Sequence, residues 1–144
     1  MLAADRFNSP EIKKLAGDMI ETMYAKDGVG LAAPQVGQSL AICVITGKYT
    51  SDKTDLVLIN LEWEKMSLRK TVDEEGCLSV PNMFGEVKRY KKIKVRGQNI
   101  KGEKIEFPAE DFFARVLQHE IDHLNGILFI EKAKKLRQAD LIQL

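Results

Sequence analysis

A chain of 144 residues has the length of one ordinary domain, so a single core built around a single site is expected. Hydrophobic residues make up 44% and charged residues 30%, and no apolar run approaches the roughly 20 residues that span a bilayer, which argues against a membrane role. The 22 Lys and Arg balance 21 Asp and Glu, so no strong net charge would gather nucleic acid or anionic lipid.

The N-terminus carries charge at Asp5 and Arg6 and shows no secretory signal, which indicates the cytoplasm as the simplest compartment. One of the two cysteines, Cys43, lies in the apolar run 40–45, which is typical of a buried structural thiol. A disulfide with Cys77 is the less favoured alternative, because it would remove a thiolate that is available to bind metal.

Helical spacing of apolar residues predicts a first helix over residues 10–25. Ser9 can cap it, and Pro10 suits its first position because that position needs no amide hydrogen. The helix should end near Gly28, at the start of a loop over residues 28–38.

Runs rich in β-branched residues predict strands over residues 40–46, 56–61, 87–90, 93–98 and 104–107, with a hairpin turn over residues 99–102. A second helix is predicted from Asp111 to about Asn125, with Gly126 as its stop. The basic stretch 88–94 is interpreted as a solvated strand edge. Two helices around a run of strands predict a one-domain α+β fold, with mostly antiparallel sheets packed around the second helix.

Both histidines of the chain lie in one His-Glu-x-x-His motif, residues 119–123, within the second predicted helix. Helical residues four apart share a face, with Cβ atoms about 5–6 Å apart, so His119 and His123 can share one ion. Glu120 is turned about 100° from His119, where it reaches a metal-bound water rather than the metal. The alternative of two exposed histidines is disfavoured, because apolar residues surround the motif and buried unpaired imidazoles are costly.

A catalytic metal site needs a third protein ligand and one open position, and no histidine remains to supply that ligand. Cys77, beside Gly76 in the segment 75–79, is the favoured candidate, although a half-buried strand cysteine is the simpler interpretation of this residue alone. Glu131 is a second candidate, but it follows the motif too closely to be preferred.

Two acidic residues could accept a hydrogen bond from the outer nitrogen of a ligand histidine: Glu75 and Asp122. Each could equally be a surface charge or pair with Arg89 or Arg115. The sequence leaves these choices open.

Three segments together resemble the signature motifs of peptide deformylases: residues 28–35 (GVGLAAPQ), 75–79 (EGCLS) and 118–126 (QHEIDHLNG). Their order and separation also agree, and the similarity spans roughly residues 12–132. The resemblance implies removal of the formyl group from N-formylmethionyl peptides or nascent chains, at the ribosome, with formate as the second product. No nucleic-acid-binding motif is visible.

By this resemblance, Cys77, His119 and His123 hold one divalent ion, which is characteristically Fe²⁺, with Zn²⁺, Ni²⁺ or Co²⁺ as alternatives. An ion there makes a bound water nucleophilic, and Glu120 is expected to act as general acid and base. Gln35 and the Leu78 backbone amide are expected to stabilise the oxyanion. Without the resemblance, Gln35 would be interpreted as an ordinary loop residue.

The peptide is expected to add as a strand beside the first motif, with Val29 and Gly30 in contact with it, or beside residues 82–85. Phe112 and Val116 are candidates for an apolar pocket that holds the methionine side chain. A role for both in the core is equally open, since they lie on the helix that carries the histidines.

Relative to many family members, the chain is expected to be a short form, with little before the first helix and no long C-terminal helix. A bacterial, organellar or viral source stays open. One rival function is a His-Glu-x-x-His metallopeptidase, which Cys77→Ala would test. Another is a structural metal site or a catalytically silent module, for which Cys43 would have to supply the fourth ligand.

Overall fold

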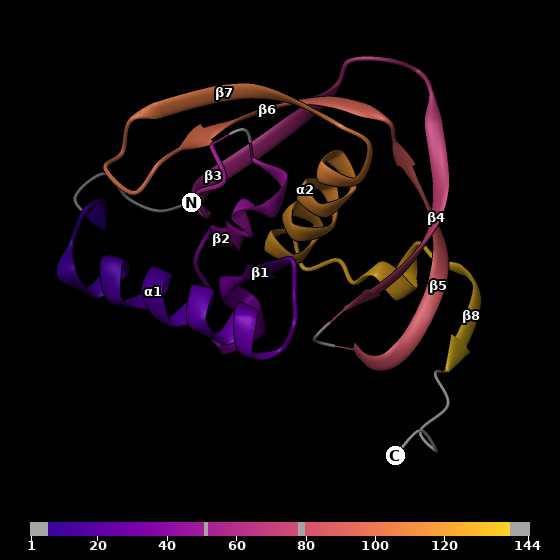
Figure 1. Ribbon diagram of the computed structural model, residues 1–144, viewed down its shortest axis with the longest axis horizontal. Coiled ribbons are helices and arrows are strands. Elements are labelled where there is room, and N and C mark those ends of the chain that lie inside the picture. The colour runs from indigo at the N-terminus through magenta and orange to yellow at the C-terminus, as the bar shows by residue number, and fades with distance from the viewer. Residues whose placement is uncertain (1–5, 51, 78–79, 139–144) are drawn as a thin grey trace.

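The computed structural model describes residues 6–50, 52–77 and 80–138, and its architecture is α+β. Within these residues the strands form two sheets, and every paired strand runs antiparallel to its neighbour. The second helix lies between the two sheets, and the first helix covers the outer side of the larger sheet (Figure 1). The predicted fold class is therefore confirmed. No helix in the described part of the chain is long and apolar enough to cross a lipid bilayer.

Helix α1 spans Pro10–Ala25, as predicted from the sequence. The Ser9 hydroxyl accepts a hydrogen bond from the Ile12 amide at 3.3 Å, so the cap that the sequence indicated is present. Ile12, Met19 and Met23 form its buried face. They pack against the outer face of the larger sheet, in one cluster with Leu31 of β1.

The larger sheet has the strand order β1-β2-β3-β6-β7. Its strands are β1 (Gly30–Ala32), β2 (Ile42–Ile45), β3 (Leu56–Lys65), β6 (Lys92–Gln98) and β7 (Lys104–Glu110). The predicted turn after β6 is present, with Gly102 at φ +86° donating its amide hydrogen to the Asn99 carbonyl at 2.9 Å. Strand β1 lies at one edge, and no described strand pairs with its outer side.

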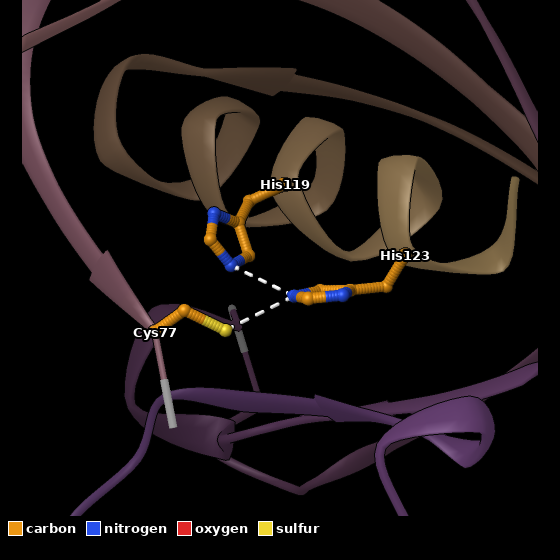
Figure 2. Close-up of side chains that lie close together, drawn as sticks. All are labelled: Cys77, His119 and His123. Carbon is orange, nitrogen blue, oxygen red and sulfur yellow. Dashed lines mark hydrogen bonds between the residues drawn. The ribbon is translucent and has the colours of Figure 1, made fainter. Parts of the chain in front are cut away.

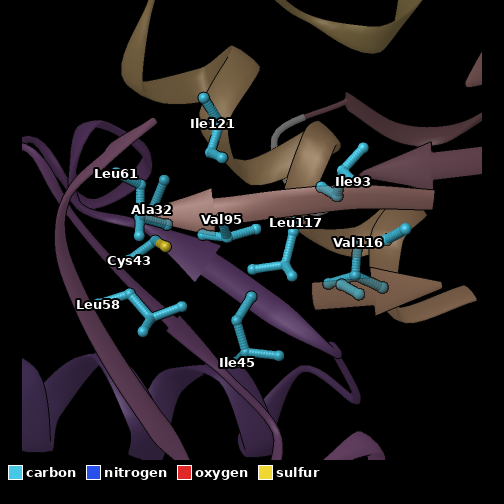
Figure 3. Close-up of a cluster of buried hydrophobic side chains, with 12 residues drawn as sticks. Ala32, Cys43, Ile45, Leu58, Leu61, Ile93, Val95, Val116, Leu117 and Ile121 are labelled. Carbon is cyan, nitrogen blue, oxygen red and sulfur yellow. The ribbon is translucent and has the colours of Figure 1, made fainter. Parts of the chain in front are cut away.

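Strands β1 and β2 of the larger sheet are buried on both faces, which explains the continuous apolar run of β2. Ile42 and Val44 face α1, whereas Cys43 and Ile45 face the second helix, α2 (Asp111–Leu124). Figure 3 shows the inner cluster, in which Leu117 and Ile121 of α2 meet side chains from the sheet. This packing makes α2 a firm platform for the side chains on its other face.

The smaller sheet has the order β4-β5-β8, with β4 at Lys70–Cys77, β5 at Val80–Tyr90 and β8 at Lys134–Gln138. Two of these strands, β4 and β8, were missed from the sequence, and β5 begins earlier than predicted. Most residues of β4 are polar and its Val72 is exposed, so the strand lacks the β-branched and apolar enrichment on which sequence prediction relies. Short 3-10 helices complete the described fold at Ala33–Val36, Gly47–Tyr49 and Phe129–Glu131.

Two further expectations are wrong. Residues 28–38 are not simply a loop, because they contain β1 and the 3-10 helix Ala33–Val36. The basic stretch 88–94 is not simply a solvated edge, because β5 lies between β4 and β8 and Arg89 is only 3% exposed. Glu75 and Asp122 compensate the buried charge of Arg89, which the local sequence does not reveal.

Candidate metal and catalytic site

Helix α2 carries both histidines on successive turns of one face. His119 and His123 lie with their Nε2 atoms 3.2 Å apart, and both rings point away from the helix axis toward the side on which Cys77 lies (Figure 2). The helix ends at Leu124, with Asn125 as its C-cap, and Gly126 adopts φ +76° beyond it. The sequence prediction placed this end about one residue later.

Cys77, the last residue of β4, meets the two histidines from the opposite side (Figure 2). Its Sγ atom lies 3.1 Å from Nε2 of His123, and the three donor atoms all lie within 4.8 Å of one another. Donors about 2.0–2.3 Å from a tetrahedral ion are themselves about 3.4 Å apart, close to the spacing found here. One thiol and two imidazoles therefore form a set that fits a single divalent ion.

The outer nitrogen of His119 is held by Glu75, whose Oε1 atom lies 2.9 Å from Nδ1. This contact leaves Nε2 facing Cys77 and His123, as ligation requires. Burial lowers the pKa of His119, but hydrogen bonds to Cys77 and Glu75 outweigh burial and raise it to about 10 in the metal-free protein. Burial raises the pKa of Glu75, whereas hydrogen bonds from His119 and Arg89 lower it to about 2.

Glu120 lies beside the ligand set, at only 4% exposure. No hydrogen-bond donor among the described residues reaches its buried Oε2 atom. Burial raises the pKa of Glu120 to about 7, although the charges of His119 and His123 oppose this rise. An unpartnered buried carboxylate oxygen is costly, so its position beside a metal-ligand set fits a group that exchanges a proton with a bound molecule.

Gly30 makes room for this carboxylate. A Cβ atom at residue 30 would lie 3.0 Å from both Cγ and Oε1 of Glu120, closer than side chains normally pack. The absence of a side chain on β1 therefore lets Glu120 occupy its position.

Gln35 lies in the 3-10 helix that follows β1. Its Oε1 atom accepts a hydrogen bond from the Ala32 amide at 2.8 Å, and its Nε2 donates to Sγ of Cys77 at 3.5 Å. The side-chain amide thus faces the ligand set, rather than solvent as in an ordinary loop. Leu78, the other expected oxyanion donor, lies outside the described residues.

A cavity of about 710 Å³ opens beside the ligand set. All four residues predicted to contact substrate, Val29, Gly30, Phe112 and Val116, line it. Val116 is buried and also belongs to the inner core cluster, whereas Phe112 is 43% exposed and packs on Tyr49 with ring centroids 5.0 Å apart. Pocket and core roles therefore coexist at Val116.

Sequence reasoning missed a second group of residues that line this cavity. They are Lys26 and Asp27, just after α1, and Glu74 of β4. No motif or apolar periodicity in the sequence marks these residues, and β4 itself was not predicted. Asn82 and Phe84 of β5 also line the cavity, within the segment 82–85 that the sequence offered as an alternative peptide edge. Of the alternative peptide edge at residues 82–85, Phe84 is already paired with both β4 and β8, whereas neither strand register includes Asn82.

The alternative ligands lie elsewhere. Cys43 is a free, fully buried thiol in the core, whose pKa burial raises well above its ordinary value. Glu131 is exposed at the end of a 3-10 helix and is not part of the cluster of donor atoms. Neither position supports a structural site with four protein ligands.

Comparison with known proteins agrees with this geometry. The polypeptide deformylase family model matches residues 2–139. A peptide deformylase of Desulfotalea psychrophila is 48% identical over 129 residues, covering 89% of this chain and 76% of the relative. The Thermotoga maritima peptide deformylase structure is 43% identical, with a TM-score of 0.83, covering 93% of this chain and 86% of that one.

A Met-Ala-Ser-bound peptide deformylase structure from Acinetobacter baumannii is 38% identical, with a TM-score of 0.84, covering 91% of this chain and 86% of that one. The family is metal-dependent, and Cys77, His119 and His123 form a site that could hold the ion. The chain belongs to the polypeptide deformylase family, whose enzymes remove the formyl group from N-formylmethionyl polypeptides.

Proposed function

We propose that Cys77, His119 and His123 hold one divalent ion in this deformylase, and that Glu120 moves the proton during hydrolysis of the formyl group. The observation that carries the assignment is the buried, unpartnered Oε2 atom of Glu120 beside the three donor atoms. Fe²⁺ is the proposed native ion, because the chain resembles a family that characteristically uses it, and Zn²⁺, Ni²⁺ or Co²⁺ would also suit the donor set. When bound, the ion would acidify a water molecule so that it attacks the formyl carbon.

Glu120 is suited to both halves of the proton transfer. Burial raises its pKa above the ordinary value, which suits a carboxylate that accepts the proton of the attacking water and then gives that proton to the departing amine. The products are formate and a peptide with a free α-amino group. Burial keeps bulk water from competing for this proton, since Glu120 is only 4% exposed.

Charge develops on the formyl oxygen during the attack, and donors that face it would stabilise the transition state. We assign this role to the Gln35 side-chain amide, which already faces the ligand set, together with the Leu78 amide. The hydrogen bond from Ala32 to Oε1 of Gln35 supports the assignment, because it orients the side chain with its NH₂ group toward Cys77.

We propose that the substrate peptide pairs with the outer edge of β1, beside Val29 and Gly30. The other side of β1 is already occupied by β2, through the pairs Gly30↔Ile45 and Leu31↔Val44. A peptide on the outer edge would lie along the cavity, with its methionine side chain near Phe112 and Val116. The Met-Ala-Ser complex of the Acinetobacter baumannii enzyme supports this class of ligand.

The proposed partner is therefore the N-formylmethionyl nascent chain, met at the ribosome in the cytoplasm, where such chains are made. The test is formate release from formyl-Met-Ala-Ser by protein prepared anaerobically with Fe²⁺. Glu120→Gln should bind the ion and lose most turnover. Glu131→Gln, which makes the same change at an exposed carboxylate, should behave as wild type. Near-normal turnover in Glu120→Gln would contradict the assigned role.

A further inference from the structure

Arg89, on β5, joins two acidic residues from different elements. Its Nε and NH2 atoms donate to the two carboxylate oxygens of Glu75 at 3.0 and 2.9 Å. Its NH1 atom donates to Oδ2 of Asp122 at 2.5 Å. All three side chains are buried, so each bond is made away from solvent, where a lost partner is not replaced by water.

Both acidic residues lie next to proposed metal ligands. Glu75 is two residues before Cys77 on β4 and holds His119 directly. Asp122 immediately precedes His123 on α2. Arg89 therefore connects the strand that carries the thiol with the helix that carries the imidazoles.

The inner core cluster does not supply this connection, although Val87 of β5 and Phe129 are also buried apolar residues. The inner core cluster joins α2 to the larger sheet, and none of its buried members in the described chain comes from β4, β5 or β8. Tyr90, at the end of β5, packs on the cluster only as a partly buried side chain, and its backbone is hydrogen-bonded by Gln118 of α2. Nearer to the ligands, the smaller sheet and α2 are joined by hydrogen bonds of the two buried guanidinium groups, Arg89 and Arg115, and by the contact of His119 with Glu75.

Arg115, on α2, also binds Glu75, but it makes its other contacts with the backbone of the smaller sheet. Its NH1 atom donates to Oε2 of Glu75 at 2.6 Å and to the Val87 carbonyl at 2.8 Å, and its NH2 atom donates to the Thr71 carbonyl at 2.8 Å. Arg115 thus anchors α2 to β4 and β5 one turn before His119. Arg89 differs because it holds both carboxylates at once.

We propose that Arg89 is a positioning residue for the metal-ligand set, holding the thiolate of Cys77 at the distance from α2 at which it shares an ion with the two histidines. The proposal rests on the metal site of the proposed function. It predicts that loss of Arg89 changes how the ion is held, and that substrate binding at the β1 edge changes little.

The test is Co²⁺ binding, measured by competition with a chelator on protein stripped of metal. The thiolate-to-cobalt absorption band reports whether Cys77 is a ligand. Arg89→Met removes the charge and the hydrogen-bond donors, and Arg89→Lys keeps the charge but cannot reach both carboxylates with one planar group. Lys88→Met, at the exposed neighbouring position, is the matched control.

We expect Arg89→Met to weaken Co²⁺ binding by about 10–100-fold, with Arg89→Lys intermediate and Lys88→Met unchanged. At saturating Co²⁺, the thiolate band of Arg89→Met should be reduced, and kcat for formyl-Met-Ala-Ser should fall while KM stays within about twofold. A residue that only stabilised the fold would lower the melting temperature and leave the band of the loaded protein intact. Wild-type affinity and a full band in both Arg89 variants would overturn the proposal.

Should Arg89→Met fail to fold, Arg89→Lys and Asp122→Asn provide the same comparison, because each weakens the bridge while keeping a similar volume. Wild-type protein that shows the thiolate band but releases no formate would contradict the proposed function and leave the Arg89 comparison valid. Wild-type protein without the band would contradict both.

Discussion

Replacing Glu120 by Gln should make the metal-free protein lose less stability than the wild type as pH rises from acidic to alkaline, even though it removes a proposed catalytic group. The folded-state pKa of Glu120 is about 7, because burial disfavours its charged form, whereas the ordinary value is 4.5. For an acid whose folded-state pKa is raised, folding is favoured most below the unfolded pKa. The free energy of unfolding then falls as pH rises through 4.5 and levels off above about 7.

The size of the effect follows from the two pKa values. At about 1.4 kcal/mol per pKa unit, ionisation of Glu120 costs the folded protein about 3 kcal/mol near pH 8 and less than about 1 kcal/mol near pH 5. Gln has nearly the same shape but does not ionise. The stability difference between Glu120→Gln and wild type should therefore shift by about 2 to 2.5 kcal/mol in favour of the variant between these pH values.

The assay is urea unfolding of both proteins with excess chelator at about pH 5 and pH 8. Any pH-independent cost of a buried amide cancels in the difference between the two conditions. Glu131→Gln should show no such shift, since residue 131 is exposed. If the difference in free energy of unfolding between Glu120→Gln and wild type is the same at both pH values, within about 0.5 kcal/mol, the raised pKa of Glu120 in the folded apoprotein is refuted.

Gly30→Ala should lower kcat by about tenfold or more with little loss of stability, because the new Cβ would lie 3.0 Å from Glu120 and push its carboxylate aside. Steady-state kinetics would check this, and unchanged kcat would contradict the close approach. Gln35→Leu should cost about 10²–10³ in kcat with KM nearly unchanged, as expected for a transition-state donor, whereas a pure KM effect would exclude that role. Cys77→Ala should abolish Co²⁺ binding, whereas Cys43→Ser should retain the ion and destabilise the core by about 1–3 kcal/mol in thermal unfolding. Retained binding in the first variant would remove the thiolate from the ligand set.

The two helices could be predicted from the sequence because their signals are local. Ser9 and Pro10 mark the start of α1, and Gly126 marks the end of α2 within a residue. The strands of the larger sheet were also predicted in part, since burial on both faces selects continuous apolar runs such as that of β2. By contrast, β1 has only three residues, all of them Gly, Leu or Ala, which leaves too short a pattern to detect.

The candidate site was predictable to the extent that its residues lie in compact motifs. The spacing of His119 and His123 is enough to place them on one helix face. The position of Cys77 opposite them depends on β4, a polar edge strand that the pattern did not reveal, so only the resemblance to a family favoured it strongly. Glu74 of β4, which also lines the cavity, was missed for the same reason.

Arg89 shows most clearly where local interpretation fails. A basic residue followed by Tyr-Lys-Lys has the composition of a solvated strand, and nothing in the neighbouring residues indicates burial. Its partners Glu75 and Asp122 lie 14 and 33 positions away, and only the folded chain shows that they compensate its charge. A buried guanidinium is tolerated only with such partners, so its burial is a property of the three-residue arrangement. Since both partners adjoin proposed metal ligands, the same arrangement that permits burial also places Arg89 where it can affect the ion.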